Sequence, residues 1–562
     1  MAGQLSESYI DNSYELQDDD DDGIRNVKDL LEFYANAKQG QEAVVFAAVG
    51  DTERKTVTFD RLYENVCKVA RSLIHLGLKQ GEVVGINLRS CPEWLYFVYG
   101  CMIAGLVPVG IAFTYKDGSD VIAMMKRLQT CALLCIDPGV DNEKWNVIQQ
   151  LVESYSDDGS VISSKMPYLR YLLGHEVGTS VMTGVKKMTD LLSTNCDVEI
   201  TDVTEDALAF LSQTSGSTGE PKLVAQTQKA VVRYRHFPTL FTDEKETVYN
   251  DRPFTWGGGF PFNCVYGQKR VTLPEFAQMP SDRFAVITTA IKTEGCTVMF
   301  SLPPFVHEMV LKKEKLPAEW LLKNLLTGGQ PLTKHVAECV GGICKNLVCV
   351  YGGTDFGVVA MGIIEDKNNF TEFSSGKIVS GVVLKIVDDE GITVPIGTMG
   401  EIYLKSHFLV KCYFNDEAKT IAAKTPDGWF KTDDFGKLTE DGELFVLGRK
   451  SNMIISGGMK VTPEILERVL NTCIGIHIAL VVPVSDEVYY QVLCACVIKQ
   501  PGSTLSEEDL HTFCTDFHND KPGLFTVLPK FYIFMDAFPE TSSGKVSRRK
   551  LSAIAEEKFG KK

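Results

Sequence analysis

The chain has 562 residues, of which 44% are hydrophobic and 23% are charged, and its formal net charge is -16 at pH 7. This length is too great for one compact core, and the composition excludes disorder for the bulk of the chain, so we expect more than one folded unit. The negative net charge argues against nucleic acid as a partner, because such a partner requires a basic face.

The N-terminal residues 1–24 contain the acidic run Asp18–Asp22 and are predicted to form an acidic disordered tail. They lack both the apolar segment of a secretory signal and the basic character of a transit peptide, and the last residues lack a Ser-Lys-Leu peroxisomal signal. The sixteen cysteines contain no CxxC pair. They are predicted to be free thiols in a reducing compartment, and we expect a cytoplasmic protein.

The first folded elements follow this tail. Apolar residues recur with helical spacing from Leu62 to Leu76 and are followed by Gly77, which predicts a helix that ends at the glycine. The apolar run Val83–Leu88 then predicts a strand. Residues 94–115 carry no charge and could cross a bilayer, but a proline and three glycines divide them. This pattern favours a buried helix followed by a strand over a transmembrane segment.

The same alternation recurs along the first four fifths of the chain and predicts α/β layers. Near residue 448 the pattern changes to a smaller α+β arrangement. We therefore expect an α/β fold with a large multi-layer N-terminal domain at 25–448 and a smaller α+β C-terminal domain at 449–562. In the second domain, Thr462, Pro463 and Glu464 predict a helix start. Strands are predicted there at 478–482, 492–498 and 531–534.

A segment rich in Ser, Thr and Gly, residues 211–222 (LSQTSGSTGEPK), lies between two apolar runs and predicts a loop that leaves a strand. Its glycines let backbone N–H groups turn inward and its hydroxyl groups add donors, which together suit a triphosphate. The GxxxxGK[ST] spacing of the P-loop is missing, which disfavours P-loop hydrolysis. A surface linker rich in Ser and Gly would have the same composition.

Further motifs follow in order: TGGQPL at 327–332, YGGTD at 351–355, GWFKTDD at 428–434 and PETSSGKVSR at 539–548. With them the chain resembles the adenylate-forming superfamily of acyl-CoA synthetases, peptide-synthetase adenylation domains and firefly-type luciferases. The resemblance covers nearly the whole chain after the acidic tail. It implies a mobile C-terminal domain and the use of ATP, Mg²⁺ and coenzyme A to activate a carboxylic acid.

The resemblance also implies a nucleotide site. The loop that holds the β- and γ-phosphates in the family corresponds here to Thr214, Ser215, Gly216, Ser217, Thr218, Gly219 and Lys222. The adenine is backed by Gly328, Gly329 and Gln330, and contacted by Tyr351 and Gly352. Thr354 reaches the α-phosphate, Asp355 helps to hold magnesium, and Asp434 and Arg449 contact the ribose and phosphate. Asp355 stands where the family usually has Glu, and Asp433 stands where it usually has Gly.

Lys545 is the predicted catalytic residue, with Thr354 and Asp355 as the other members of the catalytic set. Attack of a carboxylate on the α-phosphorus builds negative charge on the nonbridging oxygens, and a fixed ammonium group stabilises that charge. Taken alone, a lysine in a Ser/Gly loop is more often a surface residue. Its place at the end of an ordered series of motifs favours catalysis.

The second half-reaction is assigned by the same resemblance. The C-terminal domain is expected to rotate about a hinge at Ser451, so that Gly458 and Lys460 meet coenzyme A. The acyl pocket is assigned to Trp256, Gly257, Phe260 and Gly353, with Trp256 as its gate. Because the glycines of this segment remove side-chain volume, we expect a roomy apolar cavity and a medium-chain or long-chain fatty acid or an aryl acid.

Three alternatives stay open. A stand-alone adenylation domain that loads a carrier protein would share these motifs, although no carrier segment follows Lys562. An ATP-dependent luciferase would oxidise its adenylate, but Ile455 replaces the lysine that firefly-type enzymes use in that step. A nucleotide-binding protein without activity is the third alternative. Asp355 and Asp433 keep it open, whereas Lys545 and Asp434 argue against it.

Overall fold

The structure is a computed structural model that describes most of the 562 residues. The described residues are 7–12, 23–50, 52–113, 115–176, 180–193, 196–214, 222–236, 245–255, 257–261, 264–274, 282–320, 322–329, 332, 334–371, 373–520, 527–539 and 546–560. They form two compact units. The larger unit comprises Asp11–Val383 and Lys405–Phe430, and the smaller unit comprises Met1–Ile10, Leu384–Leu404 and Lys431–Lys562. The domain boundary at 448/449 stays a prediction.

An eight-stranded, mostly parallel sheet forms one part of the larger unit. Its strands, in spatial order, are β10 (Lys186–Lys187), β9 (Tyr171–Gly174), β6 (Cys131–Ile136), β4 (Val83–Asn87), β5 (Val107–Gly110), β11 (Leu208–Thr214), β12 (Lys222–Thr227) and β22 (Cys412–Tyr413). The strands from β10 to β11 run parallel, whereas β12 is antiparallel to both β11 and β22. A small hairpin, β7 (Ser154–Tyr155) and β8 (Val161–Ile162), lies apart from this sheet.

A second group of strands completes the larger unit. In spatial order they are β19 (Ser374–Ile378), β18 (Gly357–Ile364), β17 (Cys344–Gly353), β16 (Leu322–Gly328), β15 (Val298–Ser301), β13 (Thr247–Tyr249), β14 (Lys269–Thr272), β2 (Glu42–Phe46) and β3 (Lys55–Thr58). The strands from β17 to β2 are parallel and buried, which is the pattern expected when helices cover both faces of a sheet.

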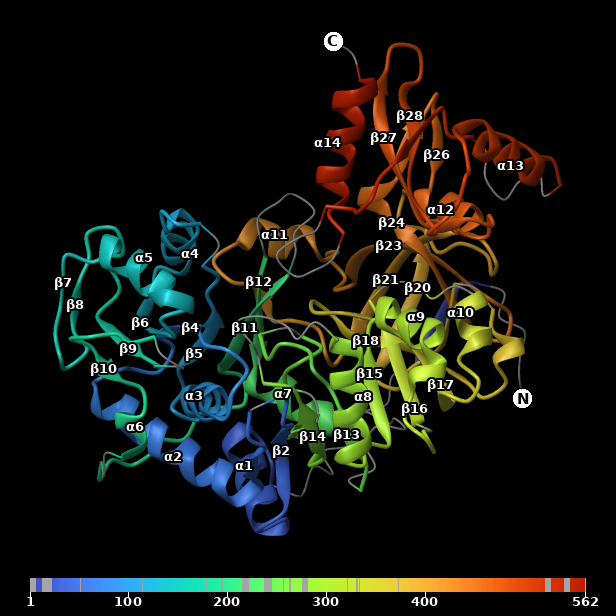
Figure 1. The fold of residues 1–562 in the computed structure, drawn as a ribbon. Coiled ribbons are helices and arrows are strands. Elements are labelled where there is room, and N and C mark those ends of the chain that lie inside the picture. The colour runs from blue at the N-terminus through green and yellow to red at the C-terminus, as the bar shows by residue number, and fades with distance from the viewer. Residues whose placement is uncertain are drawn as a thin grey trace. The chain divides into compact units, whose positions relative to one another are not determined.

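Helices connect these strands (Figure 1). They are α1 (Val27–Ala37), α2 (Phe59–His75), α3 (Pro92–Ile103), α4 (Ser119–Leu128), α5 (Glu143–Leu151), α6 (Asp190–Ser193), α7 (Gln228–Arg233), α8 (Arg283–Thr293), α9 (Pro303–Leu311), α10 (Lys334–Cys339) and α11 (Glu417–Ala422). The predicted helix before Gly77 is confirmed as α2, and residues 94–110 form most of α3 followed by β5, as expected. Among the described residues, none of the helices has the length and apolar character that crossing a membrane requires.

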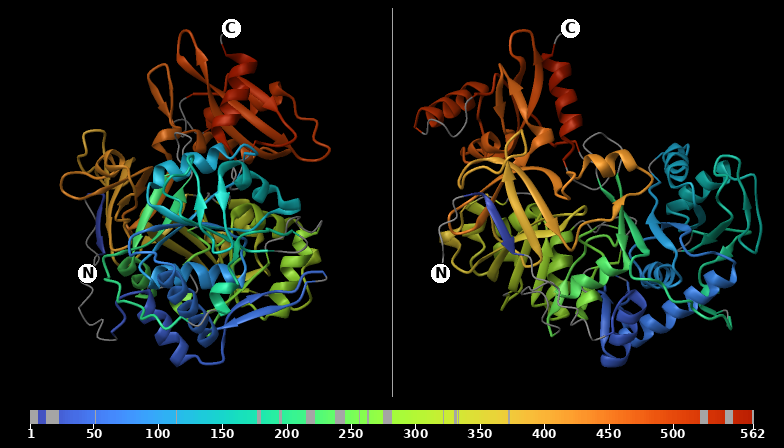
Figure 2. Two further views of the ribbon diagram at one scale, coloured as in Figure 1. Left: turned by 90° about the vertical axis from the view of Figure 1, so that its left-hand side faces the viewer. Right: turned by 180° about the vertical axis from the view of Figure 1, so that it is seen from behind.

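The smaller unit contains a three-stranded sheet, β27 (Ile476–Asp486), β28 (Tyr490–Lys499) and β29 (Phe531–Phe534). Helices α12 (Pro463–Asn471) and α13 (Glu507–Asp520) cover one face, and α14 (Arg548–Phe559) covers the other (Figures 1 and 2). One apolar cluster lies under α12 and α13, and a second lies under α14. The helix predicted at Pro463 and all three strands predicted for this domain are confirmed. Its remaining strands are β20 (Val382–Val387), β21 (Gly400–Ser406), β23 (Phe430–Leu438), β24 (Glu443–Arg449), β25 (Ile454–Ser456) and β26 (Met459–Val461).

Part of the predicted tail is ordered, which corrects the expectation for residues 7–12. Tyr9–Asn12 form strand β1, beside β20 (Figure 2, right). The Ser8 carbonyl accepts a hydrogen bond from the Ile386 amide at 2.9 Å, and Ser8 is fully buried. The segment YIDN is short and precedes the acidic run, and it completes the edge of the sheet next to β20. The acidic run itself lies outside the described residues.

Cysteines behave as predicted wherever the structure describes their side chains. Each of these is a free thiol, and most are buried in the apolar cores. The thiols therefore act as small apolar residues that fill space between strands and helices.

Candidate functional site

Several candidate residues of the larger unit lie at the carboxyl ends of neighbouring parallel strands. Residues 250–260 follow β13, Gly329 follows β16, and Thr354 and Asp355 follow β17. Strands β13, β15, β16 and β17 are adjacent and parallel, so these segments reach the same edge of the sheet. Ligands of open α/β sheets bind at this edge.

The predicted phosphate loop connects the antiparallel strands β11 and β12. Thr214 and Lys222 are paired across the two strands, so the loop leaves and re-enters the sheet at one level. The loop residues Ser215, Gly216, Ser217, Thr218 and Gly219 lie outside the described residues. The predicted strand before the loop is confirmed as β11, which ends at Thr214.

Lys222 belongs to a polar cluster with Asp355 and Tyr413. The Tyr413 hydroxyl donates a hydrogen bond to Asp355 Oδ2 at 2.8 Å, and Lys222 Nζ lies 3.9 Å from the same oxygen. Lys222 Nζ also lies 5.0 Å from the centre of the Tyr413 ring, within cation–π range. Tyr413 is positioned by the pairing of β22 with β12. The second carboxylate oxygen, Asp355 Oδ1, is buried and has no hydrogen-bond partner among the described residues.

Glycines in the YGGTD motif allow the sharp turn between β17 and β18. A Cβ at Gly352 would lie 2.6 Å from the Gly357 carbonyl oxygen, so no larger residue fits there. A Cβ at Gly353 would lie 2.7 Å from the Phe356 ring, which leaves this predicted pocket residue packed inside its own turn. The turn presents Thr354 and Asp355 at its tip. The close pairing thus fixes the carboxylate beside the phosphate hairpin.

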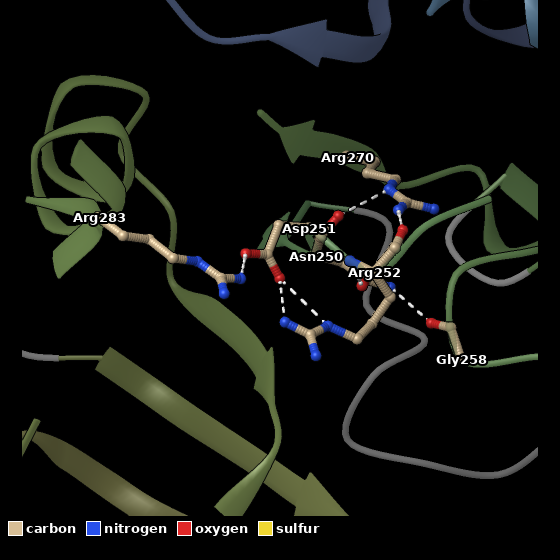
Figure 3. A network of polar contacts seen from close by, with 6 residues as sticks. All are labelled: Asn250, Asp251, Arg252, Gly258, Arg270 and Arg283. Atoms are coloured by element: carbon tan, nitrogen blue, oxygen red, sulfur yellow. Dashed lines mark hydrogen bonds and ion pairs between the residues drawn. The ribbon is translucent and has the colours of Figure 1, made fainter. Parts of the chain in front are cut away.

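The loop after β13, which contains the predicted gate, is held by a buried network (Figure 3). Arg270 on β14 is 2% exposed, and it donates hydrogen bonds to the Asn250, Arg252 and Gly259 carbonyls. Asp251 pairs with Arg252 at 2.6 Å and with Arg283 at 3.0 Å. These two cations hold the pKa of Asp251 below its usual value, although burial alone would raise it. Buried charges in this loop are therefore paired or hydrogen-bonded, as stability requires.

The glycines of this loop serve close packing, which corrects the expectation that they open a roomy cavity. A Cβ at Gly259 would lie 2.0 Å from the Pro253 carbonyl oxygen, and one at Gly257 would lie 3.2 Å from Thr354 Oγ1. The Phe260 ring is buried, and the cavity that it lines measures about 30 Å³, enough for a water molecule or two. The described loop residues fold back on themselves, whereas Trp256 lies outside the described residues.

The smaller unit carries the predicted ribose residues on the hairpin of β23 and β24. Asp434 and Arg449 are paired across the strands, and Arg449 Nε lies 3.3 Å from Asp434 Oδ1. The Asp434 side chain is 8% exposed, and its amide donates to Thr432 Oγ1 at 3.1 Å. The register of one hairpin therefore brings together these two residues, which lie 15 positions apart in the sequence.

The hairpin also explains the unusual Asp433. Its φ is +63°, in the left-handed region that glycine adopts most easily. Asp and Asn are the residues that tolerate this region best after glycine, because their short polar side chains can hydrogen-bond locally. The backbone at this position therefore favours glycine, which the resembled family usually has, and it accepts Asp433.

The predicted coenzyme A residues lie on the hairpin of β25 and β26. Lys460 Nζ forms an ion pair with Asp389, and both side chains are more than half exposed. Gly458 has a φ of +83° and no atom within 4 Å of a built Cβ, whereas a Cβ at Gly457 would lie 2.8 Å from the Tyr489 ring. Close packing in this turn thus occurs at Gly457. Ser451 is exposed in a short 3₁₀ turn, and its two flanks belong to the same compact unit.

Lys545 lies outside the described residues, but both ends of its loop are described. The Ser547 amide donates to the Pro539 carbonyl at 2.7 Å, which closes the base of the loop. Arg548 follows immediately and makes two hydrogen bonds of 2.6 Å to the Glu467 carboxylate. This fork-like pairing of a mostly buried arginine anchors the loop to α12.

The sequence is similar to a known family of enzymes. Residues 31–414 match the family model of the AMP-binding enzymes, and residues 466–545 match that of the AMP-binding enzyme C-terminal domain. The chain belongs to the AMP-binding enzyme family.

Relatives of this AMP-binding enzyme extend over most of its length. It is 26% identical to a mitochondrial medium-chain acyl-CoA ligase of Danio rerio, over 92% of this chain and 86% of the relative. It is 28% identical to a 2-succinylbenzoate CoA ligase of Bacillus cereus, over 90% of this chain and 95% of the relative. An O-succinylbenzoate coenzyme A synthetase from Bacillus subtilis, solved in complex with AMP, has the same fold. The TM-score is 0.74 at 22% identity, with 93% of this chain and 97% of that chain covered.

Three positioning residues of this AMP-binding enzyme escaped the sequence analysis. Tyr413 sits in a strand of two residues, and no motif marks it. Arg270 could have been suspected as a charged residue in the short strand KRVT, which lies in the interior of the sheet. The sequence does not distinguish Glu467 from a solvated helix residue, because its partner Arg548 is distant in the sequence.

The residues of the YGGTD turn fit a magnesium ion. Magnesium is bound through one or two carboxylates and substrate phosphates, and it keeps several of its water molecules. Asp355 offers one such carboxylate, with Oδ2 fixed by Tyr413 and Oδ1 buried and without a partner among the described residues. Its shorter side chain, compared with the usual Glu, is compatible with a bridging water.

Proposed function

We propose that this AMP-binding enzyme is an acid–thiol ligase that forms an acyl-AMP from ATP and a carboxylic acid and then transfers the acyl group to coenzyme A. The observation that carries the proposal is the cluster of Asp355, Tyr413 and Lys222. It places a fixed carboxylate oxygen and an ammonium group at the end of the hairpin that bears the phosphate loop. Such a cluster suits a metal-bound triphosphate.

Residues of the larger unit bind and orient the triphosphate in this proposal. Lys222 and the loop that begins at Thr214 bind the β- and γ-phosphates, and Thr354 orients the α-phosphate. Asp355 holds Mg²⁺, which neutralises phosphate charge when bound. The hydrogen bond from Tyr413 keeps Asp355 Oδ2 in place and leaves Oδ1 for the metal or its water.

Residues of the smaller unit have separate roles. Asp434 is buried and held by its neighbours, so it can accept hydrogen bonds from ribose hydroxyl groups without reorganising. Arg449 pairs with it and balances its charge. Lys545 stabilises the charge that develops at the α-phosphate, and its loop is anchored through Arg548 and Glu467. Lys460 meets a phosphate of coenzyme A once it leaves Asp389.

The substrate class follows from the relatives. One acts on medium-chain acids and another on 2-succinylbenzoate, so a fatty or aryl acid is the class that we propose here. The buried free thiols suit a reducing compartment, and we place the enzyme in the cytoplasm.

A panel of acids tests the proposal. The purified chain is incubated with ATP, Mg²⁺ and each acid, with and without coenzyme A, and pyrophosphate, AMP and acyl-CoA are measured. We expect acid-dependent pyrophosphate release, and acyl-CoA only when coenzyme A is present. Reactions without acid provide the baseline. Nucleotide binding without pyrophosphate release would support a protein without activity, and light emission with oxygen would support a luciferase.

A further inference from the structure

Three potential metal ligands meet at the carboxyl edge of the eight-stranded sheet, on strands that do not carry the phosphate loop. Cys91 and Glu93 lie at the start of α3, shortly after β4, and His175 directly follows β9. Strand β6 lies between β4 and β9 and runs parallel to both, so the three residues reach one edge. Their ligand atoms all lie within 4.8 Å of one another, and His175 Nε2 is 3.9 Å from Glu93 Oε2.

The imidazole of His175 has an unused nitrogen. Its side chain is only 12% exposed, and the buried Nδ1 has no hydrogen-bond partner among the described residues. A buried imidazole nitrogen is normally paired. The other ring nitrogen, Nε2, is the one that lies near Glu93 Oε2 and is therefore the nitrogen that we assign to the metal. Burial lowers the pKa of His175 and therefore favours the neutral ring, which is the form that binds metals.

The thiol of Cys91 completes a donor set of sulfur, nitrogen and oxygen. Cys91 stands at the N-cap of α3, but its side chain makes no capping hydrogen bond. Burial raises its pKa, so without a metal it stays protonated. A metal that binds there must displace the proton, and zinc does so readily.

Two cations near the cluster, Arg89 and Lys144, are already neutralised by another residue. Asp137, which is fully buried at the end of β6, lies 3.3 Å from Arg89 Nε and 3.3 Å from Lys144 Nζ. The Gly139 amide donates to the same carboxylate at 2.9 Å. These contacts assign both cations to Asp137 and leave the Glu93 carboxylate to face His175.

We propose that Cys91, Glu93 and His175 bind one Zn²⁺ ion. Thiolate, imidazole and carboxylate are the donors that zinc prefers, whereas calcium and magnesium require oxygen ligands. Tetrahedral zinc at about 2.0–2.3 Å from each ligand needs ligand atoms about 3.3–3.8 Å apart, so the side chains must close by up to about 1.5 Å. Binding breaks the S–H bond of Cys91, forms a sulfur–zinc bond and releases one proton. Water fills the fourth position.

The ion would tie the first turn of α3 to the end of β9. The next residue after Glu93 is Trp94, whose ring packs 5.0 Å from Phe254 in the loop held by Arg270. Zinc therefore stiffens the helix that supports one wall of the small cavity near Phe260. The site lies on residues that the phosphate-binding proposal does not use.

Cobalt substitution tests the proposal on the full-length protein. After treatment with a chelator, the protein is titrated with Co²⁺, and we expect a sulfur-to-cobalt charge-transfer band that saturates at one equivalent. Zn²⁺ added to the cobalt-loaded protein should abolish the band. Zn²⁺ added to the metal-free protein should release one proton per ion in weakly buffered solution. Absence of the band in the folded protein, or a band that zinc does not displace, would overturn the proposal.

Variants identify the ligands. Cys91→Ser should remove the sulfur band, and His175→Gln and Glu93→Gln should each weaken zinc binding by at least the roughly 10- to 100-fold that is typical for loss of an outer-shell partner. Cys196→Ser, at a half-buried cysteine outside the cluster, is the matched control and should keep the band. Circular dichroism confirms that each variant is folded. If Cys91→Ser does not fold, the Glu93→Gln and His175→Gln titrations decide, and affinity equal to that of the parent chain in both would refute the site.

Discussion

Two ion pairs, one in each compact unit, differ in how firmly they are held. Asp355 is 16% exposed, accepts a hydrogen bond from Tyr413 and lies near Lys222, which is itself 32% exposed. Lys460 and Asp389 are 51% and 57% exposed. An exposed pair contributes about 0–1 kcal/mol, so Lys460 can exchange Asp389 for another anion at little cost. The cluster in the larger unit is arranged before substrate arrives, whereas the pair in the smaller unit is free to change partners.

This difference predicts which half-reaction each residue serves. A fixed cluster suits charge stabilisation in the adenylation step, where reorganisation would raise the barrier. An exchangeable lysine suits the capture of a second substrate.

Lys545→Ala should have the largest effect. We expect acid-dependent pyrophosphate release to fall by about 100- to 1,000-fold, the scale for losing one preorganised charge donor. Thioester formation from supplied acyl-AMP should fall much less. Equal losses in the two assays would show that the lysine supports both steps or the fold, and the assignment would be wrong.

Asp355→Ala should lower pyrophosphate release by about 10- to 100-fold at limiting magnesium, the range for losing a group that supports a metal. Asp355→Glu should be tolerated, because a water molecule can adjust the distance to the ion. Tyr413→Phe is the matched control for the position of the carboxylate and should have a smaller effect. Full activity of Asp355→Ala under these conditions would remove Asp355 from the metal site.

Lys460→Ala should raise the KM for coenzyme A by up to about fivefold, the limit set by an exposed charge contact of about 1 kcal/mol. Pyrophosphate release without coenzyme A should not change. Asp389→Ala frees the lysine and should leave the KM unchanged or slightly lower. If Lys460→Ala impaired adenylation instead, the contrast between the two ion pairs would fail.

Asp433→Gly should have the smallest effect. The left-handed backbone suits glycine, so the free energy of unfolding should change by less than about 1 kcal/mol. Removal of one negative charge near Asp434 should lower the KM for ATP by less than about threefold at low salt, and the difference should shrink as salt is added. Calorimetry and initial rates at two salt concentrations measure both quantities. A large loss of stability would mean that the Asp433 side chain holds the hairpin.

Much of the fold could be predicted from the sequence because its signals are local. Helical spacing before Gly77, the apolar run at β4 and the Pro463 helix start each act within about one element. Strand β1 was missed because its partner, β20, lies hundreds of residues away, and a short segment before an acidic run gives no local sign of pairing.

In the candidate site, too, local sequence signals could be predicted and long-range contacts could not. Motifs located Asp355, Asp434 and Arg449, and the strand pairing of Asp434 with Arg449 follows from one hairpin. The partners of these residues could not be predicted, because Tyr413 reaches Asp355 only through the packing of β22 on β12. For the glycines after Pro253, the expectation from the sequence was wrong. Their small size suggested open space, but the fold uses it for contacts with backbone and with Thr354.

An oxygen-labelling experiment tests the proposed ligase chemistry most directly. An acid from the panel, labelled with ¹⁸O in its carboxyl group, is converted to acyl-CoA by the wild-type chain, and the released nucleotide is analysed by mass spectrometry. Attack of the carboxylate on the α-phosphorus followed by attack of the thiol on the acyl carbon leaves one carboxyl oxygen on AMP. We therefore predict AMP that carries one ¹⁸O atom. Unlabelled AMP, or ADP with the label in inorganic phosphate, would contradict an acyl-AMP intermediate.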